Sequence, residues 1–286
     1  MQDLIAGIDI GGTHVTACLV NVVSDEVISS SLSRIHIDPN QKKEIIIQIW
    51  SDLIRQCFGK AGVKPGRIGI AMPGPFDYDK GISLIRGLSK YEDLYGQNIK
   101  KLLSVNLGIS SSAIRMMNDA SAFLQGEMFC GAASSGKNLV GITLGTGLGS
   151  ASYYNSSIIE GDLYRMEFRD SRAEDHACGR WLTSEYERLS GEKLDGVKAI
   201  AGRVPSSKEA ATAFRRFGLN LGEILVRRYA DQNPETIVIG GNIAKAWDYF
   251  IPATREILIS NGKKWALVPA VLGEEAAMIG AAYLWK

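Results

Sequence analysis

Two short glycine-rich segments constrain the fold of this chain more than any other feature. The first is Gly11-Gly12-Thr13, and the second is Gly145-Thr146-Gly147. The sequences around them, GIDIGGTHVTACLVN from Gly7 and GITLGTGLGSASYYN from Gly141, align without a gap. Glycine allows positive φ and a close approach of the backbone, so each segment is expected to be a turn between two strands. Repetition of such a unit predicts two related half-molecules.

Apolar periodicity predicts how the rest of the chain is organised. Short apolar runs that end at Gly, Pro or polar residues predict strands at 4–10, 14–22, 26–32, 67–72, 114–117, 139–144, 149–154, 236–239 and 266–268. Longer segments with helical spacing predict helices at 39–57, 99–105, 119–129, 180–189, 207–228 and 274–285. This mixture of strands and helices places the chain in the α/β class.

The length of 286 residues exceeds the usual size of one simple domain, so two domains are expected. No linker rich in Pro, Gly or Ser separates the halves, and we therefore expect the domains to pack around a shared cleft. The predicted N-terminal domain comprises residues 1–118 with the C-terminal helix 274–286. The predicted C-terminal domain comprises residues 119–273.

Composition excludes several classes of function. The formal net charge is +1, and the basic residues form only short pairs on predicted helix faces, so no nucleic-acid partner is expected. The four cysteines form no CxxC motif, which favours a reducing compartment. The start of the chain has no basic region typical of a signal peptide, and no apolar run reaches the ~20 residues of a membrane helix. A cytoplasmic protein with no membrane partner is predicted.

A glycine turn between two strands can direct several backbone N–H groups at one point, and such a set of donors binds anions. Two turns facing each other across a cleft could hold the β- and γ-phosphates of a nucleotide, with Thr13 and Thr146 adding a hydroxyl each. A P-loop motif is absent. GTGLG lacks the spacing of the dinucleotide-binding motif and precedes a predicted strand rather than a helix, which excludes a Rossmann site.

Five segments together resemble the ROK family of sugar kinases and sugar-responsive repressors, in the order that the family has them. They are GIDIGGT at Gly7–Thr13, GIAMPGPFD at Gly69–Asp77, MNDASAFLQGE at Met117–Glu127, GITLGTGLGS at Gly141–Ser150 and IVIGGNIA at Ile237–Ala244. The resemblance implies a two-domain actin-like and hexokinase-like ATPase fold (ribonuclease H-like) with a central cleft. It also implies an ATP-dependent sugar kinase of the glucokinase type that uses Mg²⁺ and forms a homodimer.

The same resemblance implies a role for individual residues. Asp119 would be the general base that takes the proton from the sugar hydroxyl, and Asn118 would bind a neighbouring hydroxyl. Asp9 would face Mg²⁺ through water. The two glycine turns would hold phosphates, and Gly240, Gly241 and Asn242 would contact the adenosine. The implied sugar contacts also include Gly74, Pro75, Asp162, Arg165 and Glu185.

Purely structural interpretations remain open for several of these residues. Asp119 could serve only to start a helix, Gly74 and Pro75 only to end a strand, and Gly240-Gly241 only to form a tight turn. The chain also departs from the family in the segment that contacts sugar. The family's GExGH motif corresponds to Gly161-Asp162-Leu163-Tyr164-Arg165, and Arg165 cannot ligate zinc because it stays protonated.

The cysteine cluster that binds zinc in the family is reduced to His176-Ala177-Cys178-Gly179. One His and one Cys do not make a four-ligand zinc site, so no zinc is expected. The sequence does not identify the sugar. A repressor would need a DNA-binding domain before Gly7, and a non-catalytic ATP-binding relative would not need Asn118-Asp119, so the kinase is the favoured hypothesis over these two alternatives.

Overall fold

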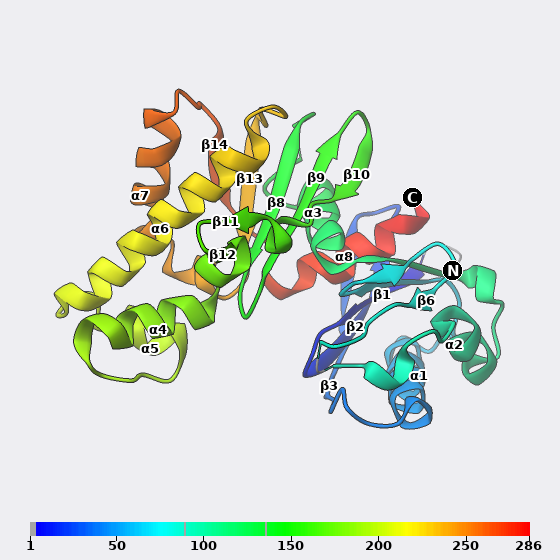
Figure 1. Ribbon diagram of the computed structural model, residues 1–286. Helices are drawn as coiled ribbons and strands as arrows, with labels where there is room; N and C mark the ends of the chain where they lie inside the picture. The colour runs from blue at the N-terminus through cyan, green and yellow to red at the C-terminus, as the bar shows by residue number, and fades with distance from the viewer. Residues whose placement is uncertain (1–3, 89, 135) are drawn as a thin grey trace. The chain divides into compact units, whose positions relative to one another are not determined.

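The computed structural model describes residues 4–88, 90–134 and 136–286. Figure 1 shows its helices and strands. The chain divides into two compact units, of which the first contains Met1–Gly131 and Glu274–Lys286 and the second contains Ala132–Gly273. The sequence-based boundary at residue 118 lies one helix earlier, because the helix that begins at Asp119 packs on the C-terminal helix and belongs to the first unit.

The first unit contains a five-stranded sheet with the strand order β3-β2-β1-β4-β7. Strands β1, β2 and β3 are antiparallel neighbours, whereas β4 and β7 run parallel to β1. The strands are β1 Leu4–Ile10, β2 His14–Asn21, β3 Glu26–His36, β4 Ile68–Met72 and β7 Ile114–Asn118. The carboxyl ends of parallel strands meet at one edge of a sheet, so the residues that follow β1, β4 and β7 come together there.

Helices cover this sheet, and the alternation of side chains along β1 assigns residues to the two faces. Ala6, Ile8 and Ile10 belong to the core that includes α1. Gly7 lies against the backbone of α8, and Asp9, two residues further on, shares its face of the strand. The helices of the unit are α1 Lys43–Lys60, α2 Ile99–Leu107, α3 Asp119–Cys130 and α8 Ala276–Ala282, and a small hairpin is formed by β5 Phe76–Asp77 and β6 Ile82–Ser83.

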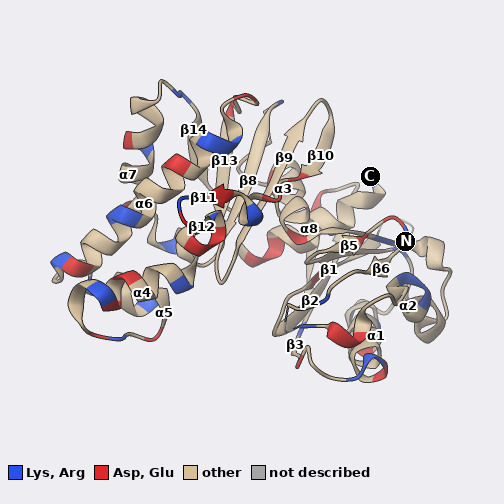
Figure 2. Ribbon diagram, viewed as in Figure 1, with Lys and Arg blue, Asp and Glu red and all other residues tan. Residues whose placement is uncertain are grey.

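The second unit contains a five-stranded sheet with the order β10-β9-β8-β13-β14. Its strands are β8 Leu139–Leu144, β9 Leu148–Tyr154, β10 Ser157–Glu160, β13 Thr236–Gly240 and β14 Ala266–Pro269. Its helices are α4 Gly179–Ser190, α5 Gly196–Arg203, α6 Lys208–Tyr229 and α7 Trp247–Ser260, and β11 Glu167–Phe168 pairs with β12 Ser171–Arg172. Figure 2 shows that the charged residues of this unit lie mainly on the helices and few lie on the strands of the sheet.

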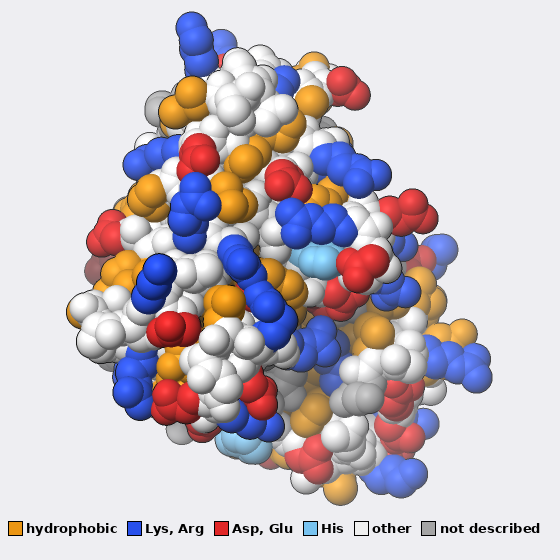
Figure 3. All heavy atoms as spheres, turned by 60° about the vertical axis from the view of Figure 1, so that its left-hand side comes forward, with side chains coloured by type: hydrophobic (Ala, Val, Ile, Leu, Met, Phe, Trp, Pro, Cys, Tyr) orange, Lys and Arg blue, Asp and Glu red, His pale blue; other side chains and the backbone are white. Residues whose placement is uncertain are grey.

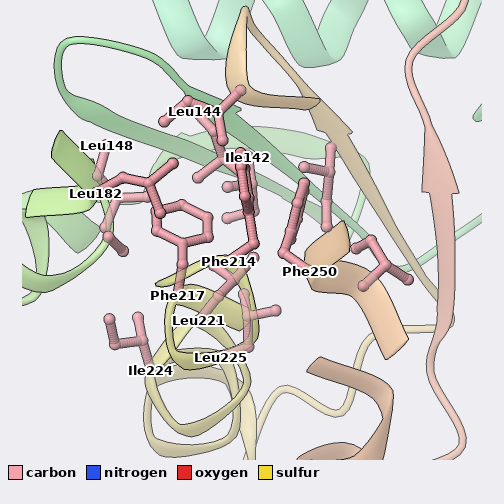
Figure 4. Close-up of a cluster of buried hydrophobic side chains, with 14 of the residues drawn as sticks. Ile142, Leu144, Leu148, Leu182, Phe214, Phe217, Leu221, Ile224, Leu225 and Phe250 are labelled. Carbon is pink, nitrogen blue, oxygen red and sulfur yellow. The ribbon is translucent and has the colours of Figure 1, made fainter. Parts of the chain in front are cut away.

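The core of the second unit forms where α6 meets β8 and α7. Figure 4 shows Phe214, Phe217 and Leu221 of α6 directed at Ile142 of β8 and Phe250 of α7. All five side chains have no exposed surface. The rings of Phe217 and Phe250 meet edge to face at 5.5 Å, a favoured aromatic geometry. This core holds β8 rigidly up to the point where the second glycine turn begins.

Short helical turns complete the two units. In the first unit they are Glu92–Leu94, Ser111–Ala113 and Tyr283–Trp285, and in the second they are Leu163–Arg165, Ala173–His176 and Ile243–Ala246. The turn Gly273–Glu275 begins at the last residue of the second unit and continues into the first. In the part of the chain that is described, no helix combines the length and apolar character needed to cross a membrane. All four cysteines are free thiols.

The predicted repeat is confirmed at the level of topology, with one correction. Both sheets place an antiparallel three-stranded meander beside two parallel strands, in the same order. In the first hairpin Ile10 pairs with Val15, whereas in the second Leu144 pairs with Leu148. The second loop is therefore one residue shorter, and the gap-free alignment does not extend to the pairing of the strands.

Candidate active site

The first glycine turn, at Gly11–Thr13, is closed by one backbone hydrogen bond. The N–H of Gly11 donates to the carbonyl of His14 at 2.9 Å. Within the described ranges, the N–H groups of Gly12 and Thr13 have no acceptor from the chain. A Cβ added to Gly12 would meet nothing within 4 Å, so the turn is open to solvent at this point. Two successive donors of this kind can bind an anion.

Tyr91 supports this turn through a hydrogen bond, and no feature of the sequence pointed to this residue. Its hydroxyl donates to the Gly11 carbonyl at 2.6 Å, and its ring, which is fully buried, packs edge to face on Trp50 at 5.5 Å. Burial and the negative charge of Asp9 raise the pKa of the Tyr91 hydroxyl, so it remains a neutral donor. The turn is thus held by a residue that lies far along the chain.

Asn118 ends β7 and caps α3. Its side-chain oxygen accepts the N–H groups of Ala120 at 2.9 Å and Ser121 at 3.1 Å, which are donors that the first helical turn leaves without a partner. Its amide nitrogen donates to the Tyr78 hydroxyl at 3.4 Å. The Tyr78 hydroxyl in turn donates to the carbonyl of Met72 at the end of β4 at 2.8 Å. The Asn118 side chain is therefore fixed in orientation.

Asp119 is the first residue of α3, and it lies at the edge where β1, β4 and β7 end. Its carboxylate accepts the N–H of Ala120 at 2.9 Å. Burial raises its pKa, and the Ala120 N–H and the charge of Lys90 oppose this effect without cancelling it. A carboxylate with a raised pKa is a stronger base, which suits the removal of a proton from a hydroxyl.

Asp9 is partly buried on β1 near Asp119. Burial, with a contribution from the like charge of Asp119, raises the pKa of Asp9 to about 7. Arg34 opposes this shift, whereas Glu274 adds to it, and these two side chains form an ion pair of 2.5 Å. The sequence identified Asp9 and Asp119 but not their charged neighbours. The first unit therefore concentrates two carboxylates of raised pKa at one edge of its sheet.

The substitution Asp9→Asn is expected to make the protein more stable above pH 7 and to have little effect near pH 4. The folded-state pKa of about 7 exceeds the ordinary value of 3.8, so the free energy of unfolding of the native protein falls as the pH rises from 4 to 7. The gain above pH 7 should be about 2–4 kcal/mol. Urea unfolding of both proteins between pH 4 and 8 tests this, and parallel pH profiles would contradict it.

The second glycine turn repeats the chemistry of the first within the second unit. The N–H of Gly145 donates to the Gly147 carbonyl at 3.0 Å. As far as the described residues show, the N–H groups of Thr146 and Gly147 have no acceptor from the chain. Thr146 is exposed, and a Cβ on Gly145 would meet nothing within 4 Å. This turn also offers two successive donors to an anion.

The predicted adenosine segment lies next to this second turn. Gly241 has φ +88°, and a Cβ there would lie 2.3 Å from the carbonyl oxygen of Leu144, the residue before the turn. Only glycine fits such a position. Gly240 ends β13 beside Thr143, and the side chain of Asn242 accepts a hydrogen bond from Lys245 at 2.9 Å. The fold thus brings the second turn and the Gly240–Asn242 segment together within one unit.

The residues predicted to contact the sugar lie in separate segments of the chain. Gly74 and Pro75 follow β4, and the Pro75 carbonyl accepts the N–H of Leu84 at 3.1 Å. Asp162 has φ +48° and forms an ion pair of 2.8 Å with Arg165, in which both side chains are about half exposed. Glu185 on α4 is bound by Arg188 and by Arg216, at 2.8 and 2.6 Å, and these two arginines lower its pKa. Its charge is neutralised within the second unit.

In the segment that replaces the family's cysteine cluster, the His176 side chain is held by residues that precede the segment. His176 Nε2 lies 3.0 Å from the Ser171 hydroxyl and 3.1 Å from the Asp170 carboxylate, and Cys178 is buried at the start of α4. No group of three or more His, Cys, Asp or Glu side chains in residues 4–88, 90–134 and 136–286 is placed to hold a metal ion. The absence of zinc stays a prediction.

Comparison with known proteins identifies the family. A model described as the ROK family matches residues 5–164 and 171–286, and the chain therefore belongs to the ROK family. It is 25% identical over 315 residues to a glucokinase from Thermotoga maritima, covering 98% of this chain and 96% of that protein. It is 21% identical over 307 residues to an N-acetyl-D-glucosamine kinase from Vibrio cholerae, covering 97% and 98%.

Among solved structures, a ROK family glucokinase from Streptomyces griseus in complex with glucose and AMPPNP matches with a TM-score of 0.78 and 22% identity over 98% of each chain. The expected fold class, a two-domain actin-like and hexokinase-like ATPase, is confirmed. The family match is interrupted between residues 164 and 171. The unmatched residues begin at Arg165, the last residue of the Asp162–Arg165 segment in which the sequence departs from the family pattern.

Proposed function

We propose that this protein is an ATP-dependent kinase that transfers the γ-phosphoryl group of ATP to a hydroxyl of a hexose. The observation that carries the proposal is the Asp119 carboxylate, which has a raised pKa and lies next to the fixed amide of Asn118. Each glycine turn presents two N–H groups that no described residue of the chain accepts, and these could bind phosphate oxygens. The relatives named glucokinase and N-acetyl-D-glucosamine kinase support a hexose as the acceptor.

In the proposed reaction Asn118 binds one hydroxyl of the sugar and places the neighbouring hydroxyl at Asp119. Asp119 accepts the proton of that hydroxyl as its oxygen attacks the γ-phosphorus in line and the bond to the ADP oxygen breaks. The developing charge on the phosphate oxygens is stabilised by the N–H groups of the turns. Positioning and charge stabilisation supply most of the rate, and the base adds about 10²–10⁴-fold.

The residues of the first unit fit a magnesium ion bound through water. Magnesium prefers oxygen ligands, keeps several of its waters and uses one or two carboxylates. Asp9 is such a carboxylate, and a cation would offset both the burial and the like charge of Asp119, which together raise the pKa of Asp9. When bound, the ion would neutralise charge on the nucleotide phosphates. Asp9 would hold its water shell, while Asp119 acts on the sugar.

The identity of the sugar is proposed at the level of glucose or a related hexose, including an N-acetylhexosamine. The test measures ADP release by a coupled assay over a panel of hexoses, N-acetylhexosamines and sugar acids, with added zinc and a chelator of zinc as controls. We expect turnover with at least one sugar of the panel. ATP binding without turnover on any sugar would contradict the proposal and favour a non-catalytic ATP-binding protein.

The formal net charge of +1 and the one face drawn in Figure 3 give no support to a DNA-binding role. On the face drawn in Figure 3, Lys and Arg side chains are interspersed with Asp and Glu side chains, and no large area of one sign is seen. A surface that binds the phosphate backbone of DNA carries an excess of basic residues. Binding to an operator fragment in a gel-shift assay would reopen the alternative of a sugar-responsive regulator.

A further inference from the structure

A glutamate that the sequence did not single out contacts the second glycine turn. Glu174 lies in the helical turn Ala173–His176, and one oxygen of its carboxylate accepts the N–H of Leu148 at 3.0 Å. The other carboxylate oxygen lies 3.4 Å from the guanidinium of Arg180. The Glu174 side chain is 28% exposed, whereas Arg180 is 72% exposed, so the glutamate is the more fixed member of the pair.

The same carboxylate also fills the space beside Gly147. A Cβ built on Gly147 would lie 2.7 Å from Glu174 Oε2, so any side chain there would displace the carboxylate from Leu148. The other end of the turn is held as well, because the N–H of Gly179 donates to the Gly145 carbonyl at 2.8 Å. Residues 174 and 179 thus hold the turn from both ends and leave the Thr146 and Gly147 N–H groups between them.

The backbone that carries Glu174 is itself well anchored. The N–H of Ala173 donates to the Met166 carbonyl at 2.8 Å, and the buried amide of Asn220 on α6 donates to the His176 carbonyl at 3.1 Å. Ala173 and Ala177 have no exposed surface and pack in the core of the second unit. A carboxylate on such a support keeps its position without reorganisation when a ligand binds.

We infer that Glu174 is a positioning residue for phosphate binding, which fixes the second glycine turn so that the Thr146 and Gly147 N–H groups face one point. The inference rests on the proposed function, because it assigns the turn to the phosphates of ATP. The hydrogen bond to Glu174 restrains the Leu148 peptide directly after the turn. Without it the two donors no longer share one orientation.

The test compares Glu174→Ala and Glu174→Gln with the native protein. Alanine removes the acceptor for the Leu148 N–H, and the dissociation constant of ATP measured by calorimetry should rise about 10-fold or more. Glutamine keeps an acceptor at the same distance along the side chain, and its ATP affinity should stay within about threefold of the native value. Sugar affinity should not change in either variant.

Glu256→Ala serves as the matched control. Glu256 on α7 forms an ion pair of 2.9 Å with Arg215 on α6 in the same unit, and no contact joins it to the turn in the described residues. Its loss should leave ATP affinity unchanged. Hydrogen exchange at the Leu148 amide in nucleotide-free protein gives a second measurement, and it should speed up about 10-fold or more in Glu174→Ala alone.

The outcomes separate this inference from the proposed function. Native protein that binds ATP, together with Glu174→Ala that binds it equally well, would overturn the positioning role only. Equal losses in the Ala and Gln variants would also overturn it, since charge rather than the hydrogen bond would then matter. Failure of the native protein to bind ATP would overturn both, while faster exchange at Leu148 would still report the contact itself.

Discussion

Replacing Asp119 with asparagine is expected to lower kcat for sugar phosphorylation by about 10²–10⁴-fold, with the fold intact. Asparagine has nearly the same shape and can still accept the Ala120 N–H that Asp119 accepts at 2.9 Å. It cannot take a proton from a hydroxyl. Because burial raises the pKa of Asp119, a neutral side chain at this position should also not lower stability. The coupled ADP assay and urea unfolding measure the two effects.

Asp248→Asn is the control for this prediction, since Asp248 also lies in the first turn of a helix, α7. The control should keep native kcat. A kcat of Asp119→Asn near the native value would mean that Asp119 only starts α3, which is the structural interpretation that the sequence left open. A loss of kcat together with a loss of stability would also count against the base, because the effect would then be on folding.

Local features of the sequence were sufficient to predict much of this site. The strand at 139–144 was predicted with the bounds of β8, because its apolar run stops at a glycine turn. Ser207 was expected at the start of a helix and caps α6 by accepting the N–H of Ala210. At the start of α3, however, the capping side chain is that of Asn118, and Asp119 is an acidic residue in the first turn.

Boundaries were less predictable where tertiary contacts override the local pattern. The helix predicted from Pro39 begins at Lys43, because residues 39–41 form a turn, Lys42 is extended and the Lys43 N–H is bound by Asp93. The strand predicted at 26–32 continues to His36. Ser31 within this strand is buried and accepts the Leu19 N–H at 2.7 Å, at an irregularity in the pairing. The short α5 and β10 were not predicted.

The partners that shape the site could not be predicted, because they are distant in the sequence. Tyr91 binds the Gly11 carbonyl, and Arg34 and Glu274 set the electrostatic surroundings of Asp9. The pKa of Asp9 depends first on burial, which no pattern within β1 reveals. Sequence motifs therefore pointed to the groups that are proposed to bind a ligand, whereas the fold was needed to find the residues that surround and tune them.

Glycines on β1 and β4 let helix α8 rest closely on the sheet, and this close packing explains how Asp9 and Asp119 come close. Substitution of one of these glycines is expected to have the largest effect on stability. Gly7 and Gly69 are paired neighbours on adjacent strands. A Cβ on Gly7 would lie 2.0 Å from the Met278 carbonyl oxygen, and one on Gly69 would lie 1.8 Å from the Ala281 carbonyl oxygen. Helix α8 therefore rests directly on the sheet, and α3 packs on α8 through Gly126 and Gly280 in the same way.

Gly69→Ala is expected to lower the free energy of unfolding by about 3 kcal/mol or more. The added methyl group meets the backbone of α8, which cannot rotate away as a side chain could, so α8 must shift from the sheet. Gly66→Ala is the matched control three residues earlier, because a Cβ there meets nothing within 4 Å and the loss of chain entropy in the unfolded state should leave stability unchanged or slightly higher. Urea unfolding of both variants gives the measurement. A Gly69→Ala protein as stable as Gly66→Ala would show that α8 is not packed on β4 at backbone contact, and the closeness of Asp9 and Asp119 would then need another cause.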